Sequence, residues 1–273
     1  MLFILFCFQD VVICQEKYIN PDSISFVILY NEVSLNDSLI SDQGFSCLVE
    51  CGGSSCLFDA GRIPETLKRN AETIGADYSK IDRIFISHLH SDHVGGLPGI
   101  ISKCNKPVLF LPFSYPKKQT AQGRRYVVES IEKANPYVSD IIKKRESFNI
   151  DGFLYSTGMF EEQTYEQALI INTTKGLIIL VGCSHPGIAE IVHRAKLLMK
   201  QDVYFVMGGF HLAVTDDERV KSIANELKGV TKFIAPCHCT GDKAQQIFKE
   251  IFKEDYIEIK TGLQFKLNER SLK

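Results

Sequence analysis

The sequence predicts an α/β fold in which helices cover the outer faces of two packed β-sheets. β-Rich runs follow one another in the first part of the chain, whereas strands alternate with helices in the second part, a pattern typical of layered α/β architectures. Apolar residues make up 45% of the 273 residues and charged residues 23%, which is usual for a globular protein with a substantial core. We therefore expect a single domain over residues 23–273, preceded by a leader at 1–22.

The first predicted elements are a strand, a hairpin and a helix. SISFVILYN (23–31) alternates in polarity and is rich in β-formers, which favours a strand. FSCLVEC (45–51) and CLFDAG (56–61) flank a Gly-Gly-Ser-Ser turn and so predict a hairpin that ends at an aspartate. PETLKRNAETIG (64–75) has a proline near its start, a glycine at its end and one apolar face, and this combination predicts a helix.

The later elements follow from short apolar runs bounded by turn residues and from two helical patterns. In chain order they are strands at 83–87, 107–112, 168–173 and 177–182, a helix at 189–200, strands at 203–209 and 232–236, a helix near 243–253 and a closing strand at 256–260.

Residues 113–150 differ from the rest of the chain in charge. They contain eight lysines and arginines but only four acidic residues. We expect this stretch to form a helical, basic cap inserted into the domain. It is either a solvated surface or a lid whose cations bind an anionic substrate such as a phosphate, with Arg124 and Arg125 as the candidates.

The N-terminal segment MLFILFCFQDVVIC allows two interpretations. Its apolar run of about eight residues is short for a signal peptide, lacks a basic start and is far too short to span a bilayer. A leader without fixed structure or an extra edge strand, in a cytoplasmic protein, is therefore the favoured interpretation. A cleaved signal or a membrane anchor is the alternative.

Charge and cysteine content limit the partners and the compartment. The formal net charge of -2 provides no basic field for nucleic acid or an anionic membrane, and we expect neither as a partner. Nine cysteines, an odd number, are scattered along the chain, which favours buried thiols in a reducing compartment over a disulfide framework. Cys51 and Cys56 could still pair as a loop staple.

Three of the seven histidines lie together in RIFISHLHSDHVGG, directly after a predicted strand. In an extended segment His88 and His90 point to the same side. A turn after them would bring Asp92 and His93 to a second point nearby. Imidazole and carboxylate are good ligands for zinc, iron and manganese. Two adjacent pairs of such ligands can hold two ions a few ångströms apart, the arrangement of hydrolytic two-metal sites.

Three of the other four histidines also follow predicted strands, beside glycine or proline. They are His185 in VGCSHPG, His211 in MGGFHL and His238 in APCHCTG. If the strand ends share one edge of the sheets, these side chains converge on the first cluster. His193 lies inside a predicted helix, so we interpret it as a packing or surface residue.

At these residues the chain resembles the metallo-β-lactamase superfamily. His-x-His-x-Asp-His is the defining motif of that superfamily, FDAG carries Asp59 at its acidic support position, and GCSHPG and PCHCTG resemble its third and last regions. The resemblance implies a four-layer αβ/βα sandwich with metals at one edge. It also implies a first metal bound by His88, His90 and His185 and a second bound by Asp92, His93 and His238.

Further segments resemble one subgroup of the superfamily, among them STG (156–158), EQAL (166–169) and GGFHL. Its members are commonly labelled 7,8-dihydropterin-6-methyl-4-(β-D-ribofuranosyl)aminobenzene-5′-phosphate synthase or related metal-dependent hydrolases. One feature departs from the superfamily. Many members carry a bridging aspartate in a Gly-Asp pair after the fourth strand, where this chain has Met-Gly-Gly-Phe-His. Either His211 fills that role or contacts substrate, or the second metal is held more weakly.

The resemblance implies a metal-dependent hydrolase or transferase that acts on a small anionic metabolite, phosphorylated or pterin-related. We expect one or two divalent ions, zinc first and iron or manganese as alternatives. Asp92 is placed to orient a water molecule or shuttle its proton, and His211 is a second candidate acid or base. The alternatives are a nucleic-acid phosphodiesterase of the same superfamily, which the net charge disfavours, and an inactive metal-binding scaffold. The oligomeric state stays open.

Overall fold

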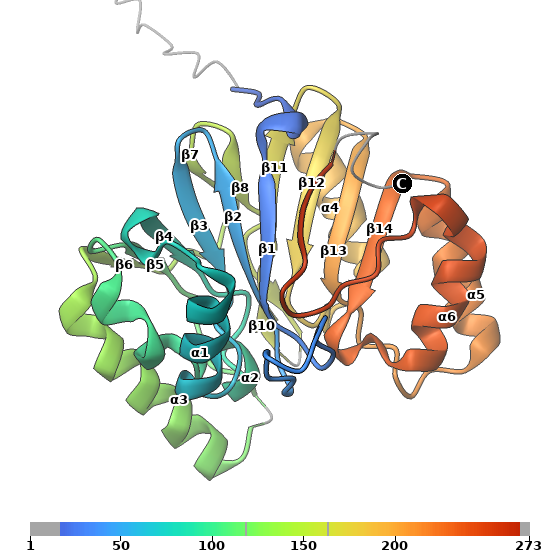
Figure 1. Cartoon of the computed structure of the whole chain (residues 1–273). Coiled ribbons are helices and arrows are strands. Elements are labelled where there is room, and N and C mark those ends of the chain that lie inside the picture. The colour runs from blue at the N-terminus through green and yellow to red at the C-terminus, as the bar shows by residue number, and fades with distance from the viewer. Residues whose placement is uncertain (1–16, 118, 163, 268–273) are drawn as a thin grey trace, which may run out of the picture.

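The structure, a computed structural model, describes residues 17–117, 119–162 and 164–267. Two β-sheets pack face to face and helices cover both outer faces (Figure 1). The first sheet contains, in spatial order, β15 (Gln264–Lys266), β1 (Ser25–Tyr30), β2 (Ser46–Cys51), β3 (Ser54–Phe58), β4 (Ile81–Phe85), β5 (Val108–Phe110) and β6 (Asp140–Ile142). The second contains β14 (Thr231–Cys237), β13 (Val203–Gly209), β12 (Gly176–Val181), β11 (Leu169–Thr173), β8 (Leu154–Ser156) and β7 (Phe148–Asp151).

Helices form the outer layers of this sandwich. The first sheet is covered by α1 (Pro64–Ile74), α2 (Ser91–Val94) and α3 (Ala121–Ala134), and the second by α4 (Ile188–Met199), α5 (Asp217–Lys228) and α6 (Asp242–Phe252). A ribbon of β9 (Phe160–Glu161) and β10 (Tyr165–Glu166) stands apart. Short 3-10 helices are η1 (Pro21–Ser23), η2 (Tyr78–Lys80), η3 (Leu97–Gly99), η4 (Ile101–Lys103), η5 (Asn135–Tyr137), η6 (His238–Thr240) and η7 (Lys253–Asp255).

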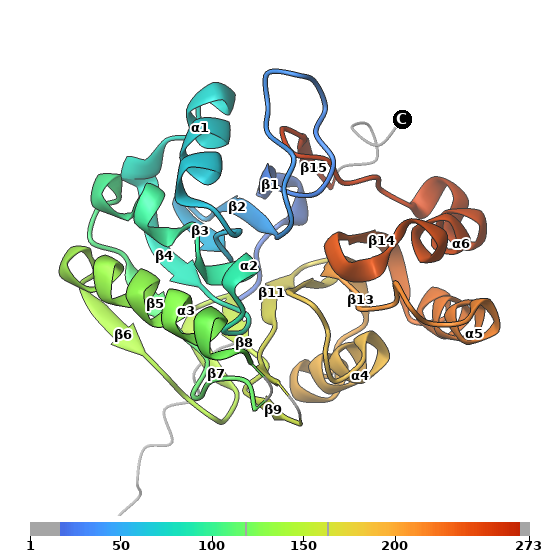
Figure 2. The same ribbon diagram turned by 90° about the horizontal axis from the view of Figure 1, so that it is seen from below.

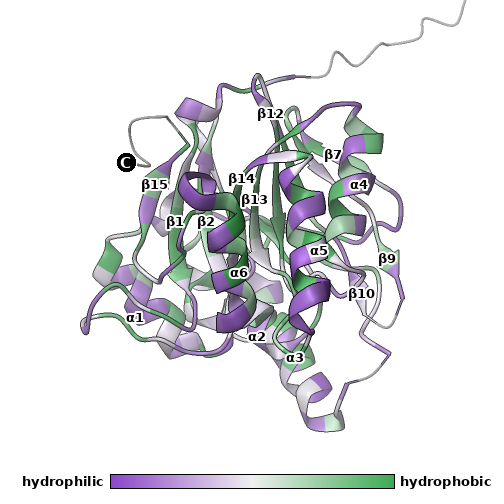
Figure 3. Ribbon diagram, turned by 90° about the vertical axis from the view of Figure 1, so that its right-hand side faces the viewer, coloured by the Kyte–Doolittle hydropathy of each residue, from purple (hydrophilic) through white to green (hydrophobic). Residues whose placement is uncertain are grey.

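Alternation along the strands produces the layers. In β1, Phe26 joins the core between the two sheets, whereas Val27 packs under the helices of the first sheet. Buried apolar residues of α4, α5 and α6 form a third core with the outer face of the second sheet. Figure 3 shows α5 and α6 with both hydrophilic and hydrophobic residues in front of hydrophobic strands. The structure therefore confirms the four-layer sandwich.

Most of the predicted elements are present. α1 begins with Pro64 and ends at Gly75, whose φ of 78° is the left-handed conformation that glycine adopts most easily. The predicted hairpin is β2 and β3, which pair in antiparallel register. The strand predicted at 83–87 is β4, which begins and ends two residues earlier. It does not reach Ser87, whose N–H donates to the side chain of Asp59 instead.

Near the C-terminus one predicted strand is wrong, and one helix is absent from the predictions. The closing strand is not 256–260: within that stretch Tyr256 makes an isolated bridge with Ile234, and the strand is β15, which pairs with β1. Helix α5 was not predicted, although Asp216 caps it by accepting from the N–H of Arg219 at 3.0 Å.

The 113–150 stretch, expected as a helical cap, is only partly helical, since α3 is followed by β6 and β7.

Other expectations concern the leader, the cysteines and the membrane. Residues 1–16 of the predicted leader lie outside the described residues, and Ile19 makes a bridge with Thr173. The seven described cysteines are free thiols, so Cys51 and Cys56 do not pair. Within the described ranges, we find no helix with the length and apolar character needed to cross a membrane.

Candidate metal centre

The topology brings five loops to one edge of the sandwich. β3 and β4 are parallel neighbours in the first sheet, and β12, β13 and β14 are parallel neighbours in the second. The carboxyl ends of parallel strands share an edge, where ligand sites form in open α/β sheets. The loops that follow these five strands carry the residues Asp59, His88, His90, Asp92, His93, Cys183, His185, His211 and His238. Figure 2 looks at this edge from below.

The first ligand group consists of His88, His90 and His185. Their potential ligand nitrogens lie within 4.8 Å of one another. The Nε2 atom of His185 is buried, and within the described part of the chain it has no hydrogen-bond partner. Burial lowers the pKa of all three imidazoles, to about 4 for His90 and about 3 for His185, so they are neutral at neutral pH.

The second ligand group consists of Asp92, His93 and His238. The two Nε2 atoms are 3.2 Å apart, and Asp92 Oδ2 lies 3.5 Å from that of His238 and 3.9 Å from that of His93. Burial favours the neutral form of each group, but the attraction between the carboxylate and the two imidazolium rings outweighs this effect. It lowers the pKa of Asp92 and raises the pKa values of both histidines, with help from carboxylates behind them.

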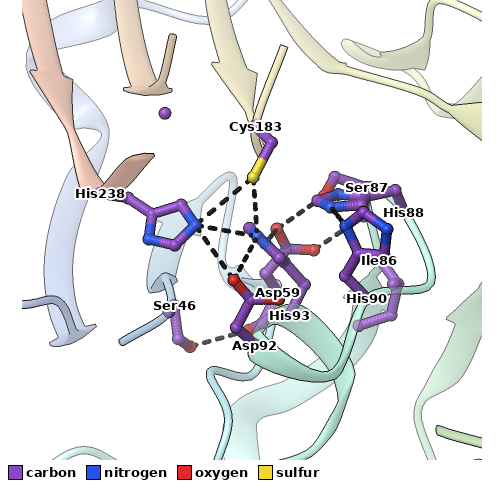
Figure 4. A network of polar contacts seen from close by, with 12 residues as sticks. Ser46, Asp59, Ile86, Ser87, His88, His90, Asp92, His93, Cys183 and His238 are labelled. Carbon is purple, nitrogen blue, oxygen red and sulfur yellow. Dashed lines mark hydrogen bonds and ion pairs between the residues drawn. The ribbon is translucent and has the colours of Figure 1, made fainter. Parts of the chain in front are cut away.

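Cys183 lies between the two groups, as Figure 4 shows. Its Sγ is 3.3 Å from His93 Nε2 and 3.4 Å from His238 Nε2, and it also lies within 4.8 Å of a ring nitrogen of His88 and of His185. Cys183 was not among the predicted ligands, because the bridging acid was expected at Met-Gly-Gly-Phe-His. The signal was present, because Gly182-Cys183 follows a strand just as a Gly-Asp pair would.

Two carboxylates, the fully buried Asp59 and the partly exposed Glu32, hold the ligands from behind. Asp59 accepts from His93 Nδ1 at 2.6 Å and from the N–H and the hydroxyl of Ser87, each at 2.7 Å. Glu32 accepts from His238 Nδ1 at 2.6 Å. Such partners fix the tautomer and the orientation of an imidazole, so that Nε2 faces the centre.

Glu166 holds the loop that carries Cys183 and His185. This fully buried carboxylate accepts from three successive backbone N–H groups, those of residues 183 to 185, at 2.9, 2.8 and 2.8 Å. Burial raises the pKa of Glu166, while the three donors act in the opposite direction. The EQAL segment at 166–169 therefore contributes to the site without contacting its centre.

The backbone around the centre is strained. Four non-glycine residues adopt left-handed φ angles of 49° to 62° here: Asp59, Ser184, His211 and His238. Such conformations cost of order 1–3 kcal/mol each and gather at functional sites. Gly182 has no room for a side chain, since a Cβ there would lie 2.0 Å from the hydroxyl of Ser87. The backbone thus adopts strained conformations at the positions that present or support the ligands.

His211 stands at the edge of the centre. Its ring lies 4.5 Å from that of His185, and its side chain is exposed on one side. A hydrogen bond with Cys239 raises the pKa of His211, so it holds a proton more easily than an isolated histidine. This position agrees with the predicted role as an acid, a base or a substrate contact, which stays a prediction. His193 is a half-exposed residue of α4 with Glu226 at 3.4 Å, as expected.

The two predicted substrate arginines are engaged elsewhere on α3. Arg125 pairs with Glu129 at 2.7 Å, and the guanidinium of Arg124 stacks 4.8 Å from the ring of Tyr115. Both are exposed. Their role in substrate binding stays a prediction.

The residues present fit a divalent metal. Nitrogen, carboxylate and thiol donors converge with their ligand atoms facing one another, and the buried Nε2 of His185 needs a partner that no described residue provides. Nitrogen and sulfur donors in such sets favour zinc, and carboxylate with imidazole also accepts iron or manganese.

Known proteins share this chain's sequence and fold. The family model described as "Anti-Pycsar protein Apyc1" matches residues 39–118. A 7,8-dihydropterin-6-methyl-4-(β-D-ribofuranosyl)-aminobenzene-5′-phosphate synthase from Methanocaldococcus jannaschii is 32% identical over 83% of this chain and 90% of the relative. A solved metal-dependent hydrolase of the β-lactamase superfamily superposes with a TM-score of 0.71, at 23% identity, over 90% of this chain and 100% of that one. Human tRNase Z, short form, reaches 0.57 at 14% identity, over 89% and 99%.

The chain belongs to the metallo-β-lactamase superfamily and, within it, to the family of the dihydropterin synthase. This confirms the family that the histidine motif predicted. The solved structures, both under 25% identical, support the fold alone.

Proposed function

We propose that the protein is a metal-dependent enzyme that acts on a small, phosphorylated, pterin-related metabolite. The observation that carries this proposal is the meeting of the two ligand groups around Cys183 at one edge of the sandwich. The substrate class comes from the synthase of Methanocaldococcus jannaschii, whose name contains a pterin, a ribosyl group and a phosphate. The reaction is either hydrolysis or transfer to an aminobenzene acceptor.

In this proposal the first ligand group would hold one ion and the second ligand group another, with Cys183 as a further donor beside both. When bound, such divalent ions would supply an activated water molecule and stabilisation of negative charge at neutral pH. Zinc suits the thiol and imidazole donors best.

Asp92 and His211 would handle protons beside that centre. The lowered pKa of Asp92 keeps it a carboxylate, which can accept a hydrogen bond from a nucleophilic hydroxyl and orient it. The raised pKa of His211 lets it hold a proton near neutral pH and donate it to a leaving group.

Metal analysis followed by a substrate panel tests the proposal. We expect about two equivalents of metal per chain after purification without chelator, and turnover that chelation removes and zinc, iron or manganese restores. The panel contains a dihydropterin diphosphate with ribosylaminobenzene 5′-phosphate, a phosphodiester, a lactone and a structured RNA. Less than half an equivalent of metal would contradict the proposal, and turnover of RNA alone would establish the nucleic-acid alternative.

The two ligand groups should differ in the protons that metal binding displaces. Without metal, the first ligand group is neutral at neutral pH, because burial lowers its pKa values. In the second ligand group, nearby carboxylates raise the pKa values of His93 and His238, so these rings stay protonated to a higher pH than those of the first ligand group. Burial likewise raises the pKa of Cys183, which is then a thiol. Ligands must lose such protons before they bind a metal.

Calorimetric titration of the metal-free protein with zinc should therefore show two unlike binding events. In buffers of different ionisation enthalpy, one event should release more protons than the other. Lowering the pH from about 8 to about 6 should weaken that event more, since protons compete there. Equal proton release from both events would contradict the assignment of the groups.

A further inference from the structure

We propose that a cavity beside the metal-ligand loop binds the phosphate group of the substrate, with Arg62 as its main contact. The cavity has a volume of about 450 Å³ and lies between the start of α1, α2 and the first turns of α3. Its walls include Arg62, Ser91, Thr120, Gln122 and Tyr126. This inference rests on the proposed function, because it assigns a subsite to that same substrate.

The cavity lies next to the loop that carries the metal ligands. Ser91 lines it and stands between His90 and Asp92, one residue of each ligand group. Figure 2 shows α2, which begins at Ser91, flanked by α1 and α3. In this proposal an extended substrate places its phosphate in the cavity and its reacting group at the centre.

The wall that carries Arg62 is tied rigidly to the metal-ligand loop. The N–H of Ala60 donates to the carbonyl of His93 at 2.8 Å, and the N–H of Gly96 donates to the carbonyl of Gly61 at 3.1 Å. Gly95 permits the close packing, since a Cβ there would lie 2.1 Å from the carbonyl oxygen of Arg62. Cavity and centre are thus held at a constant separation, as a site for an extended substrate requires.

The charge of Arg62 is available to an anion. Its guanidinium contacts the neutral side chain of Gln43 at 3.3 Å, and no carboxylate of the described residues lies within 4 Å of it. By contrast, Arg145 is already paired, because its guanidinium holds Glu161 through two nitrogens. A guanidinium binds phosphate through two parallel hydrogen bonds, and Arg62 is the one cation among the described residues that line the cavity.

The remaining walls suit the sugar or ring next to a phosphate. The hydroxyl of Tyr126 donates to the carbonyl of Arg62 at 3.0 Å, which fixes the aromatic ring as a flat wall. Gln122 adds an exposed amide that can donate to phosphate oxygens. The volume lies in the range of small-molecule sites. One cation, one aromatic wall and a few polar groups fit a phosphorylated riboside.

Calorimetry on the metal-loaded protein tests the inference without relying on turnover. The two probes are 4-(β-D-ribofuranosyl)aminobenzene 5′-phosphate and the same riboside without phosphate. We expect Arg62→Ala to weaken binding of the phosphorylated probe by about 10- to 100-fold and binding of the other probe by less than about 2-fold. Arg62→Lys should retain part of the affinity for the phosphorylated probe, because lysine keeps the positive charge but cannot form the two parallel hydrogen bonds of a guanidinium.

Arg69→Ala is the matched control, because Arg69 is an exposed arginine of α1, the helix that follows Arg62, and lies outside the cavity. It should bind both probes like the wild type, and thermal melting of every variant shows whether it is folded. The inference is wrong if Arg62→Ala binds the phosphorylated probe normally, or if the wild type does not prefer that probe. A loss confined to the Arg124→Ala/Arg125→Ala double variant would place the phosphate on α3 instead. Failure of the proposed function would appear separately, as missing metal or missing turnover.

Discussion

Cys183→Ala should lower metal-dependent turnover by at least about 100-fold and remove about one equivalent of metal, while the protein stays folded. The thiol lies between the two ligand groups, within 3.4 Å of ring nitrogens of His93 and His238. Alanine leaves no donor at this point, and no described carboxylate occupies it. Metal content and turnover, measured on the same preparation, check this outcome.

Two variants separate a ligand from a packing residue at this position. Cys183→Asp supplies a carboxylate donor in place of the thiol, and it should keep the second equivalent of metal and a substantial part of the activity. Cys104→Ala removes a half-buried thiol from the outer layer of the first sheet and should change neither quantity. Two bound metals and full activity in Cys183→Ala would show that the thiol only fills space.

Asp59→Asn should destabilise the fold by about 3–5 kcal/mol and weaken metal affinity about 10- to 100-fold. Asp59 is fully buried and accepts from His93 and twice from Ser87. The amide introduced at position 59 has only one acceptor oxygen. Its N–H₂ group must point at one of the N–H or O–H donors of His93 and Ser87, which leaves that donor buried without an acceptor. The ring of His93 would lose its orientation as well.

The stability loss in Asp59→Asn should depend on pH in the metal-free protein. Asp59 and Asp92 raise the pKa of His93 above its usual value of about 6.5. A raised pKa contributes stability that is fully present below the unfolded pKa and is lost as the pH rises through the folded pKa. The variant should therefore lose more stability at about pH 6 than at about pH 9.

Urea denaturation at both pH values measures this effect. Asp82→Asn makes the same substitution at a half-exposed position of β4 and should cost less than about 1 kcal/mol. If both variants unfold at the same urea concentration, the buried network around Asp59 does not stabilise the fold.

Local patterns predicted most of the secondary structure. Proline and glycine mark the ends of α1, and apolar runs mark strands such as β12 and β13. The stretch at 256–260 shows the limit of this approach. It alternates like a strand, yet its residues are held by one bridge to β14 and by side-chain packing, while β15 pairs with β1. Pairing partners come from the tertiary arrangement, which alternation does not encode.

In the candidate metal centre, too, some features could be predicted from the sequence and others appear only in the tertiary structure. By itself the sequence predicted the superfamily, which the relatives confirm, and six candidate ligands, whose metal binding stays a prediction. Those residues could be grouped because they lie in segments that follow strands, and strand ends share an edge. Only the tertiary structure decided that Cys183 lies between the two ligand groups and that Arg62 faces a cavity beside Ser91. Those positions depend on how two sheets and three helices pack, over separations of up to 145 residues, as between His93 and His238. Packing at that range is set by the whole core and leaves no local signature.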